Sequence, residues 1–235
     1  MKFSRILLAT LVFTALSACM SHEAAAASDN VIGYTYSGGT KTAIYLQSPD
    51  KSDGNDIKSV SIDELIRRAG NNDVEAVHIL GMRYIDGNGV ERDKDLGFSM
   101  VKKAADQGYA PAECDLGFLY YVGRGTNVDF KKAFELFSRA ADKGHAVAQN
   151  NVGAMYNNGI YVHKSITKAI SWYKKAARQG NITAQRNLGE LFETGDEGIQ
   201  KNPSEAAKWY RMAAEQGDEK SIKALSRLNI GPKSR

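Results

Sequence analysis

The residues that could serve as an activated nucleophile in this chain are serines followed by a lysine three positions later. A serine hydroxyl attacks well only when a neighbouring base takes its proton, and a lysine one helical turn away is placed to do so. This S-x-x-K pattern occurs at Ser48, Ser99, Ser165 and Ser171. No K-T-G element accompanies it, and the chain has no G-x-S-x-G, H-E-x-x-H, P-loop or G-x-G-x-x-G motif. We therefore predict no catalytic residues.

Metal-ligating patterns are equally weak. The stretch from Asp86, DGNGVERDKDLG, begins like a calcium loop, but Val90 and Gly97 stand where an oxygen ligand and the bidentate glutamate belong. The four histidines, at 22, 78, 145 and 163, lack metal-site spacing. The sequence thus predicts neither a metal nor a cofactor.

Composition and charge place the chain among ordinary globular proteins. Of 235 residues, 43% are hydrophobic and 25% are charged, and the formal net charge is +4. The basic residues alternate with acidic ones instead of forming a stripe, so we expect no nucleic-acid partner.

The first 27 residues predict export. Lys2 and Arg5 precede an apolar run from Ile6 to Leu16, which is too short to cross a membrane but typical of a signal peptide. Two processing sites remain open. Leu16-Ser17-Ala18-Cys19 resembles the lipobox of bacterial lipoproteins, in which Cys19 is lipidated and anchors the protein, by that resemblance in the outer membrane; alternatively, cleavage falls near Ala27 and leaves a soluble periplasmic protein. Cys114 would then be the one remaining thiol, so packing alone must stabilise the fold.

A repeat with a period of 36 residues organises the rest of the chain. Its signature glycines are Gly81, Gly117, Gly153 and Gly189, each with an alanine five residues before and an aromatic residue three after. This spacing forms one stripe of a helix. Because glycine inside a helix costs about 1 kcal/mol relative to alanine, we expect a second helix to pack closely against it.

The second helix of each unit carries a bulky pair followed by two alanines. The bulky pairs are Met100-Val101, Leu136-Phe137, Trp172-Tyr173 and Trp209-Tyr210, and closing glycines follow at 108, 144, 180 and 217. Glycine at that place is typical of a left-handed helix end. Both tryptophans are therefore predicted to be core residues.

Each unit consists of the pattern A-x-x-x-L-G-x-x-Y, a glycine-rich turn and the pattern A-x-x-W-Y-x-x-A-A-x-x-G. These units resemble the Sel-one-like repeat (SLR) family, whose members are tetratricopeptide-like. The resemblance implies an all-α solenoid of four helix-hairpin repeats, at 73–109, 110–145, 146–181 and 182–218, and an exported bacterial type. Gly97 replaces the second-helix alanine of the other units, from which we expect a looser first unit.

The flanking segments should close the array. Residues 60–72 are predicted to form a capping helix with Ser61 as N-cap and Glu64 three residues on. Residues 219–235 are predicted to form a second capping helix and a tail, with Ile222, Leu225 and Leu228 inward. For residues 28–59 two interpretations remain, disorder or a short β-hairpin around Gly38-Gly39. Residues 48–59 are predicted to be a polar linker.

If tetratricopeptide geometry carries over, the first helix of each unit lines a concave face. Ten residues are our predicted partner-binding positions: His78, Met82, Ile85, Cys114, Phe118, Tyr121, Asn150, Asn157, Arg186 and Glu190. We predict a non-enzymatic scaffold of the cell envelope that holds a partner protein or peptide. Two alternatives stay open. One is a penicillin-interacting or penicillin-hydrolysing protein, because some SLR proteins with a cysteine pair in each repeat are so described; the other is an organiser of peptidoglycan or another envelope polymer.

Overall fold

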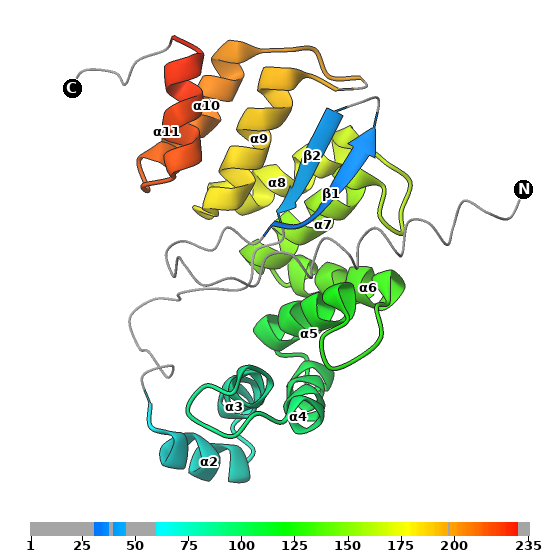
Figure 1. Cartoon of the computed structure of the whole chain (residues 1–235), viewed down its shortest axis with the longest axis vertical. Coiled ribbons are helices and arrows are strands. Elements are labelled where there is room, and N and C mark those ends of the chain that lie inside the picture. The colour runs from blue at the N-terminus through cyan, green and yellow to red at the C-terminus, as the bar shows by residue number, and fades with distance from the viewer. Residues whose placement is uncertain (1–30, 38–39, 46–59, 197, 230–235) are drawn as a thin grey trace, which may run out of the picture.

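A computed structural model describes residues 31–37, 40–45, 60–196 and 198–229 of the chain, with side chains from residue 60 onward (Figure 1). The proposed lipidation site Cys19, the cleavage site near Ala27, the linker at 48–59 and the tail after 229 lie outside the described residues. None of the described helices has both the length and the hydropathy that a membrane-spanning helix needs.

Helices of similar length follow one another along the described chain. Four antiparallel pairs lie between two shorter helices, and Figure 1 shows them stacked from α2 at one end to α11 at the other. The bounds are α2 (Ile62–Gly70), α3 (Val74–Asp86), α4 (Lys94–Asp106), α5 (Ala110–Val122), α6 (Phe130–Asp142), α7 (Ala146–Asn158), α8 (Ile166–Arg178), α9 (Ile182–Thr194), α10 (Pro203–Ala214) and α11 (Glu219–Arg227). The predicted all-α solenoid of four repeats is confirmed.

Local sequence signals explain where these helices begin and end. The Ser61 hydroxyl accepts a hydrogen bond from the Glu64 backbone N–H at 3.3 Å, which starts α2. After α4 and α8 the chain turns at Gly108 and Gly180, whose φ angles of +79° and +85° suit glycine. The predicted N-cap and helix-ending glycines are therefore confirmed.

The signature glycines lie where the second helix of the same repeat approaches most closely. A Cβ atom added to Gly117 would lie 2.9 Å from the Phe137 ring, and one added to Gly189 would lie 2.5 Å from the Tyr210 ring. Real Cβ atoms do not come so close to other atoms, so only glycine lets these rings pack against the helix backbone. Four glycines within helices thus have a common packing cause.

The first repeat is closely packed, contrary to the looser unit we expected from Gly97. A Cβ on Gly97 would lie 2.5 Å from the Gly81 carbonyl oxygen and 2.7 Å from Ile85. Val101 occupies the place that an aromatic ring takes in the other repeats, and its smaller side chain lets α3 and α4 approach each other backbone to backbone. Two facing glycines make that approach possible.

The tyrosine of each Trp-Tyr pair, and not the tryptophan, is the core residue. Tyr173 and Tyr210 are buried, whereas Trp172 and Trp209 lie half-buried at the edge of the core. Lys175 lies 3.7 Å from the centre of the Trp172 ring, and the Trp209 indole N–H donates to Glu205 at 3.2 Å. The expectation that both tryptophans are core residues was wrong. On each helix it is the tyrosine after the tryptophan that points at the signature glycine of the same repeat.

The C-terminal capping helix α11 packs through Leu225 and Leu228, as predicted, but not through Ile222. Ser221, Ala224 and Leu225 are buried and Leu228 is half-buried, whereas Ile222 is exposed. The packed residues follow an i, i+3, i+4, i+7 pattern against α10, which leaves Ile222 on the other side.

The two strands of the described structure form an antiparallel hairpin of β1 (Val31–Ser37) and β2 (Thr40–Tyr45). Tyr34 pairs with Ala43 and Tyr36 pairs with Lys41. β2 lies against α7, the first helix of the third repeat (Figure 1). Of the two interpretations left open for this segment, the structure therefore has the hairpin, placed on the repeat array.

Candidate partner-binding surface

We call the positions three before, one after, four after and five after each signature glycine the first-helix face, carried by α3, α5, α7 and α9. Six of the ten predicted binding residues on this face are buried: His78, Ile85, Cys114, Tyr121, Asn150 and Arg186. The other four keep part of their surface accessible: Met82, Phe118, Asn157 and Glu190. The buried six have little or no surface to offer a partner in this conformation, and whether the other four bind one stays a prediction.

Residues three before the signature glycine link neighbouring repeats. His78 Nε2 lies 2.6 Å from Asp115 Oδ2 in the next repeat, and the Asn187 side-chain amide donates to Asn150 Oδ1 at 3.0 Å. Arg186 forms an ion pair with Asp218, the N-cap of α11, at 2.5 Å. Each of these bonds pairs a buried polar group with one across the repeat interface, which offsets part of the cost of burying it. Asp115 Oδ1 stays buried without a donor.

Cys114 and Tyr121 lie within the core between the second and third repeats. Burial, and to a lesser extent the nearby Asp115 carboxylate, raises the pKa of the Cys114 thiol. Burial raises the pKa of Tyr121 to about 12. A thiol with a raised pKa and no exposed surface is a poor nucleophile, so Cys114 acts as a small core residue.

The accessible part of the first-helix face changes in character along the array. Met82 and Phe118 make it apolar in the first two repeats, Asn157 makes it an amide surface in the third, and Glu190 makes it acidic in the fourth. Asn157 Oδ1 is buried and has no hydrogen-bond donor. Such an acceptor costs free energy until a donor reaches it.

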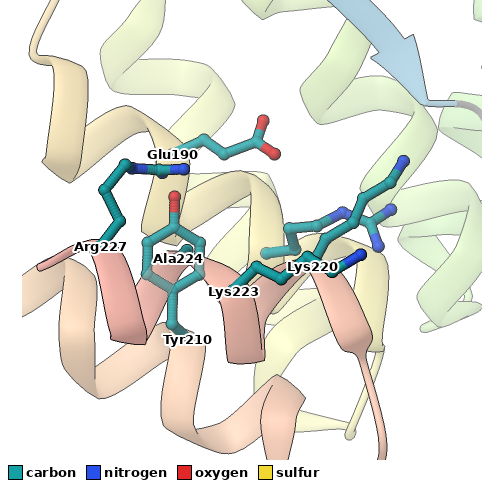
Figure 2. Close-up of a pocket in the computed structure, with 7 residues that line it drawn as sticks. Glu190, Tyr210, Lys220, Lys223, Ala224 and Arg227 are labelled. Carbon is teal, nitrogen blue, oxygen red and sulfur yellow. The ribbon is translucent and has the colours of Figure 1, made fainter. Parts of the chain in front are cut away.

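At the fourth repeat the face runs into a cleft of about 270 Å³ between α9 and α11 (Figure 2). Its lining residues are Arg186, Glu190, Tyr210, Lys220, Lys223, Ala224 and Arg227. Burial raises the pKa of Glu190, and the neighbouring Arg186 and Lys220 oppose that rise only in part. Glu190 is the acidic residue in a lining that also holds four cationic side chains.

Three of the cationic side chains of this cleft, Lys220, Lys223 and Arg227, come from α11. Lys223 and Arg227 are also exposed to solvent. Arg227 donates two hydrogen bonds to Glu193, at 2.8 and 2.7 Å, and the Tyr210 hydroxyl donates to the same carboxylate at 2.7 Å. The spacing of Lys220, Lys223 and Arg227 at i, i+3 and i+7 marked one helix side, yet the sequence contained no signal that this side faces α9.

Three of the four S-x-x-K serines lie within the described residues, and Ser48 lies outside them. Ser165 is the N-cap of α8, and its hydroxyl accepts a hydrogen bond from the Lys168 backbone N–H at 3.4 Å. Ser99 and Ser171 are exposed on the second helices of their repeats. Among the described residues, no group of three or more histidine, cysteine, aspartate or glutamate side chains is arranged to hold a metal ion.

The repeats also match a known sequence profile. The profile of the Sel1 repeat matches residues 74–109, 110–145, 146–181 and 182–218, which together are more than half of the chain. The chain belongs to the Sel1 repeat family. No protein of curated function matches it significantly over its sequence.

Two solved structures of Sel1 repeat proteins are similar to this one. A protective antigen present in uropathogenic Escherichia coli strains, which displays an SLR fold, is 34% identical with a TM-score of 0.67; the match covers 72% of this chain and 36% of that protein. A Sel1 repeat protein from Oxalobacter formigenes is 31% identical with a TM-score of 0.66, over 73% of this chain and 72% of that one. The present chain thus spans about a third of the E. coli protein.

Sel1 repeat proteins serve in general as protein-interaction scaffolds and are typically not enzymes. Membership of the family therefore directs attention to surfaces that bind proteins, and not to a catalytic centre. On the first-helix face, the predicted binding residues that stay partly accessible are Met82, Phe118, Asn157 and Glu190.

Proposed function

We propose that this protein is a non-enzymatic scaffold of the bacterial cell envelope that binds a partner protein or peptide along its first-helix face. The observation that supports this most directly is the change along one continuous face from Met82 and Phe118 to Asn157 and then to Glu190. A repeat array in which core positions recur while one row of side chains varies is suited to selective recognition, because each repeat contributes a different contact.

The partner that suits this face has two chemically different parts. Its apolar part contacts Met82 and Phe118, where burying aromatic surface supplies most of the binding free energy. Its other part supplies backbone N–H and C=O groups to the amide of Asn157, whose buried Oδ1 lacks a donor. An extended peptide segment with apolar side chains at one end meets both requirements.

Site-specific photocrosslinking tests this proposal. A benzoylphenylalanine probe replaces Phe118 on α5, and a control protein carries the same probe at Glu135, which is exposed on α6 of the same repeat. We expect the Phe118 probe to capture one defined protein in envelope preparations and the Glu135 probe not to capture it. Equal capture from both positions, or no capture from either, contradicts binding at the first-helix face.

The envelope location rests on the signal-like residues 1–27 and the lipobox ending at Cys19. We propose export followed by acylation of Cys19, since two or more acyl chains hold a protein firmly at a membrane. Metabolic labelling with palmitate tests this in the native chain and in Cys19→Ser. Label that disappears in Cys19→Ser supports the anchor, whereas an unlabelled protein whose mature N-terminus follows Ala27 supports a soluble periplasmic form.

A further inference from the structure

The hairpin of β1 and β2 contacts a helix that lies about a hundred residues further along the chain. β2 ends at Tyr45, and α7, against which it lies, begins at Ala146 (Figure 1). The next element after the hairpin is α2, which packs against α3 at the opposite end of the array from α11. β2 thus lies on the third repeat, whereas α2 lies beside the first.

The intervening chain is long enough for this path. Residues 46–59 number 14, and 14 residues span at most about 50 Å. From α2 to α7 there are five steps between packed helices, each of about 8–10 Å, and the zigzag of a solenoid makes the direct distance shorter than their sum. The hairpin can thus reach the third repeat and also leave it without unfolding the array.

The hairpin depends on the repeat array for its stability more than the array depends on the hairpin. Each repeat has its own packing contacts within residues 60–228, such as the Phe137 ring on Gly117 and the Tyr173 ring on Gly153. A two-stranded hairpin without further support is marginal in water. The hairpin therefore gains stability from α7, whereas the solenoid retains its own core if the hairpin is absent.

The chemistry of α7 suits an extended strand. At the first-helix face α7 carries Asn150, Ala154, Asn157 and Asn158, which are short side chains and mostly amides. Short side chains allow a backbone to come close. Asn150 is buried and bonded to Asn187, and Asn157 Oδ1 has no hydrogen-bond donor with the hairpin in place, so the small size of these side chains is what suits the strand. The other first helices carry larger residues there, such as Phe118 and Glu190.

We propose that the hairpin of residues 31–45 is a built-in, displaceable occupant of the first-helix face at α7, and that an external protein partner must compete with it. This inference rests on the proposed scaffold function for the identity of the competitor, but not for the docking of the hairpin. The linker keeps the hairpin at a high effective concentration beside α7. A partner therefore binds more weakly to the chain that carries the hairpin than to the array alone.

A peptide-binding assay tests the docking without any partner protein. The probe is a fluorescein-labelled peptide of residues 31–47, titrated with the array of residues 60–235 and with the chain of residues 28–235. We expect saturable binding to the array and at least about tenfold weaker binding to the longer chain, because its own hairpin already occupies α7. Equal affinity for the two proteins, or equal binding of a scrambled peptide, overturns the inference.

Variants of the array locate the docking site. Asn157→Arg places a long charged side chain on the proposed site, and Ser171→Arg places the same side chain on the exposed surface of α8 in the same repeat. We expect Asn157→Arg to weaken peptide binding by about tenfold or more and Ser171→Arg to leave it unchanged, with both proteins showing native helical circular dichroism. Loss of binding in both variants, or in neither, contradicts docking at α7.

The competition is tested with the partner captured from Phe118, once purified. We expect it to bind residues 60–235 at least about tenfold more tightly than residues 28–235. Equal affinity overturns the competition. A failure to capture any partner contradicts the scaffold function, and the peptide assay still decides whether the hairpin docks.

Discussion

His78 in the first repeat and Asp115 in the second approach to 2.6 Å across 37 residues of sequence. Asn150 and Asn187 have the same relationship in the third and fourth repeats, also 37 residues apart. The residue three before one signature glycine thus meets the residue two before the next, which links first helices that otherwise pack mainly through the second helices between them. Polar pairs at these points help to set how successive repeats stack.

A double-mutant cycle measures this link. Asp115→Ala leaves His78 buried without its partner, and we expect the free energy of unfolding to fall by about 1–3 kcal/mol. His78→Ala should cost a similar amount, and the double variant should cost less than the sum of the two. Urea denaturation of the four proteins gives the coupling. If the losses of unfolding free energy in the two single variants add up to the loss in the double variant, the contact between His78 and Asp115 contributes no interaction energy of its own.

The signature glycines should not tolerate alanine. In Gly189→Ala the new Cβ lies 2.5 Å from the Tyr210 ring, so α9 and α10 must separate, at a cost of about 1–3 kcal/mol. Gly70 is the matched control, because a Cβ there meets nothing within 4 Å and alanine favours a helix by about 0.5–1 kcal/mol. Thermal unfolding of both variants decides the matter, and equal effects would contradict the packing account.

Substitutions of two nearby apolar residues of α5 should have different effects, one mainly on stability and the other mainly on partner binding. Leu116 is 3% exposed, so Leu116→Ala should lower the free energy of unfolding by about 2–5 kcal/mol through the cavity it leaves. Phe118 is half-buried, so Phe118→Ala should cost less stability and weaken partner capture. A loss of stability from Phe118→Ala as large as that from Leu116→Ala would show that Phe118 serves only the core.

Glu190 predicts a dependence of stability on pH. Because burial raises its pKa in the folded protein above the ordinary value of 4.5, the folded state binds its proton more tightly than the unfolded state does. The contribution of Glu190 to stability therefore falls as the pH rises from the unfolded to the folded pKa, and it stays lower above that. We expect Glu190→Gln to be more stable than the native protein at pH 7, with little difference at pH 4. Urea denaturation of both proteins at both pH values measures this. If the difference in the free energy of unfolding between Glu190→Gln and the native protein is the same at pH 4 and pH 7, the prediction is wrong.

Ser165 should matter as a helix cap and not as a nucleophile. Ser165→Ala removes the side-chain acceptor at the start of α8 and should cost about 0.5–2 kcal/mol. Ser171→Ala is the control, since Ser171 is exposed in the interior of α8. We expect no turnover of nitrocefin by the native protein. Turnover that either substitution abolished would support a penicillin hydrolase instead.

The sequence by itself determined the fold, because its signals are local and repeated four times. Glycines at intervals of 36 residues, alanine stripes and closing glycines each act within one helix or one turn. The sequence did not predict the close packing of α3 against α4, because Gly97 considered alone suggested a loosely packed repeat. In the structure Gly97 faces Gly81, and the absence of a side chain at both positions lets the two helix backbones approach closely.

The tertiary structure alone decided which of the predicted binding residues reach the surface. His78, Asn150 and Arg186 lie on the same side of their helices as accessible residues. They are buried because the next helix pair or the capping helix places a polar partner opposite each of them. Likewise, the hairpin pattern around Gly38-Gly39 contained no sign that β2 lies on α7. Helix and turn signals depend on neighbours a few residues away, whereas burial and docking depend on segments that the solenoid brings together from distant parts of the chain.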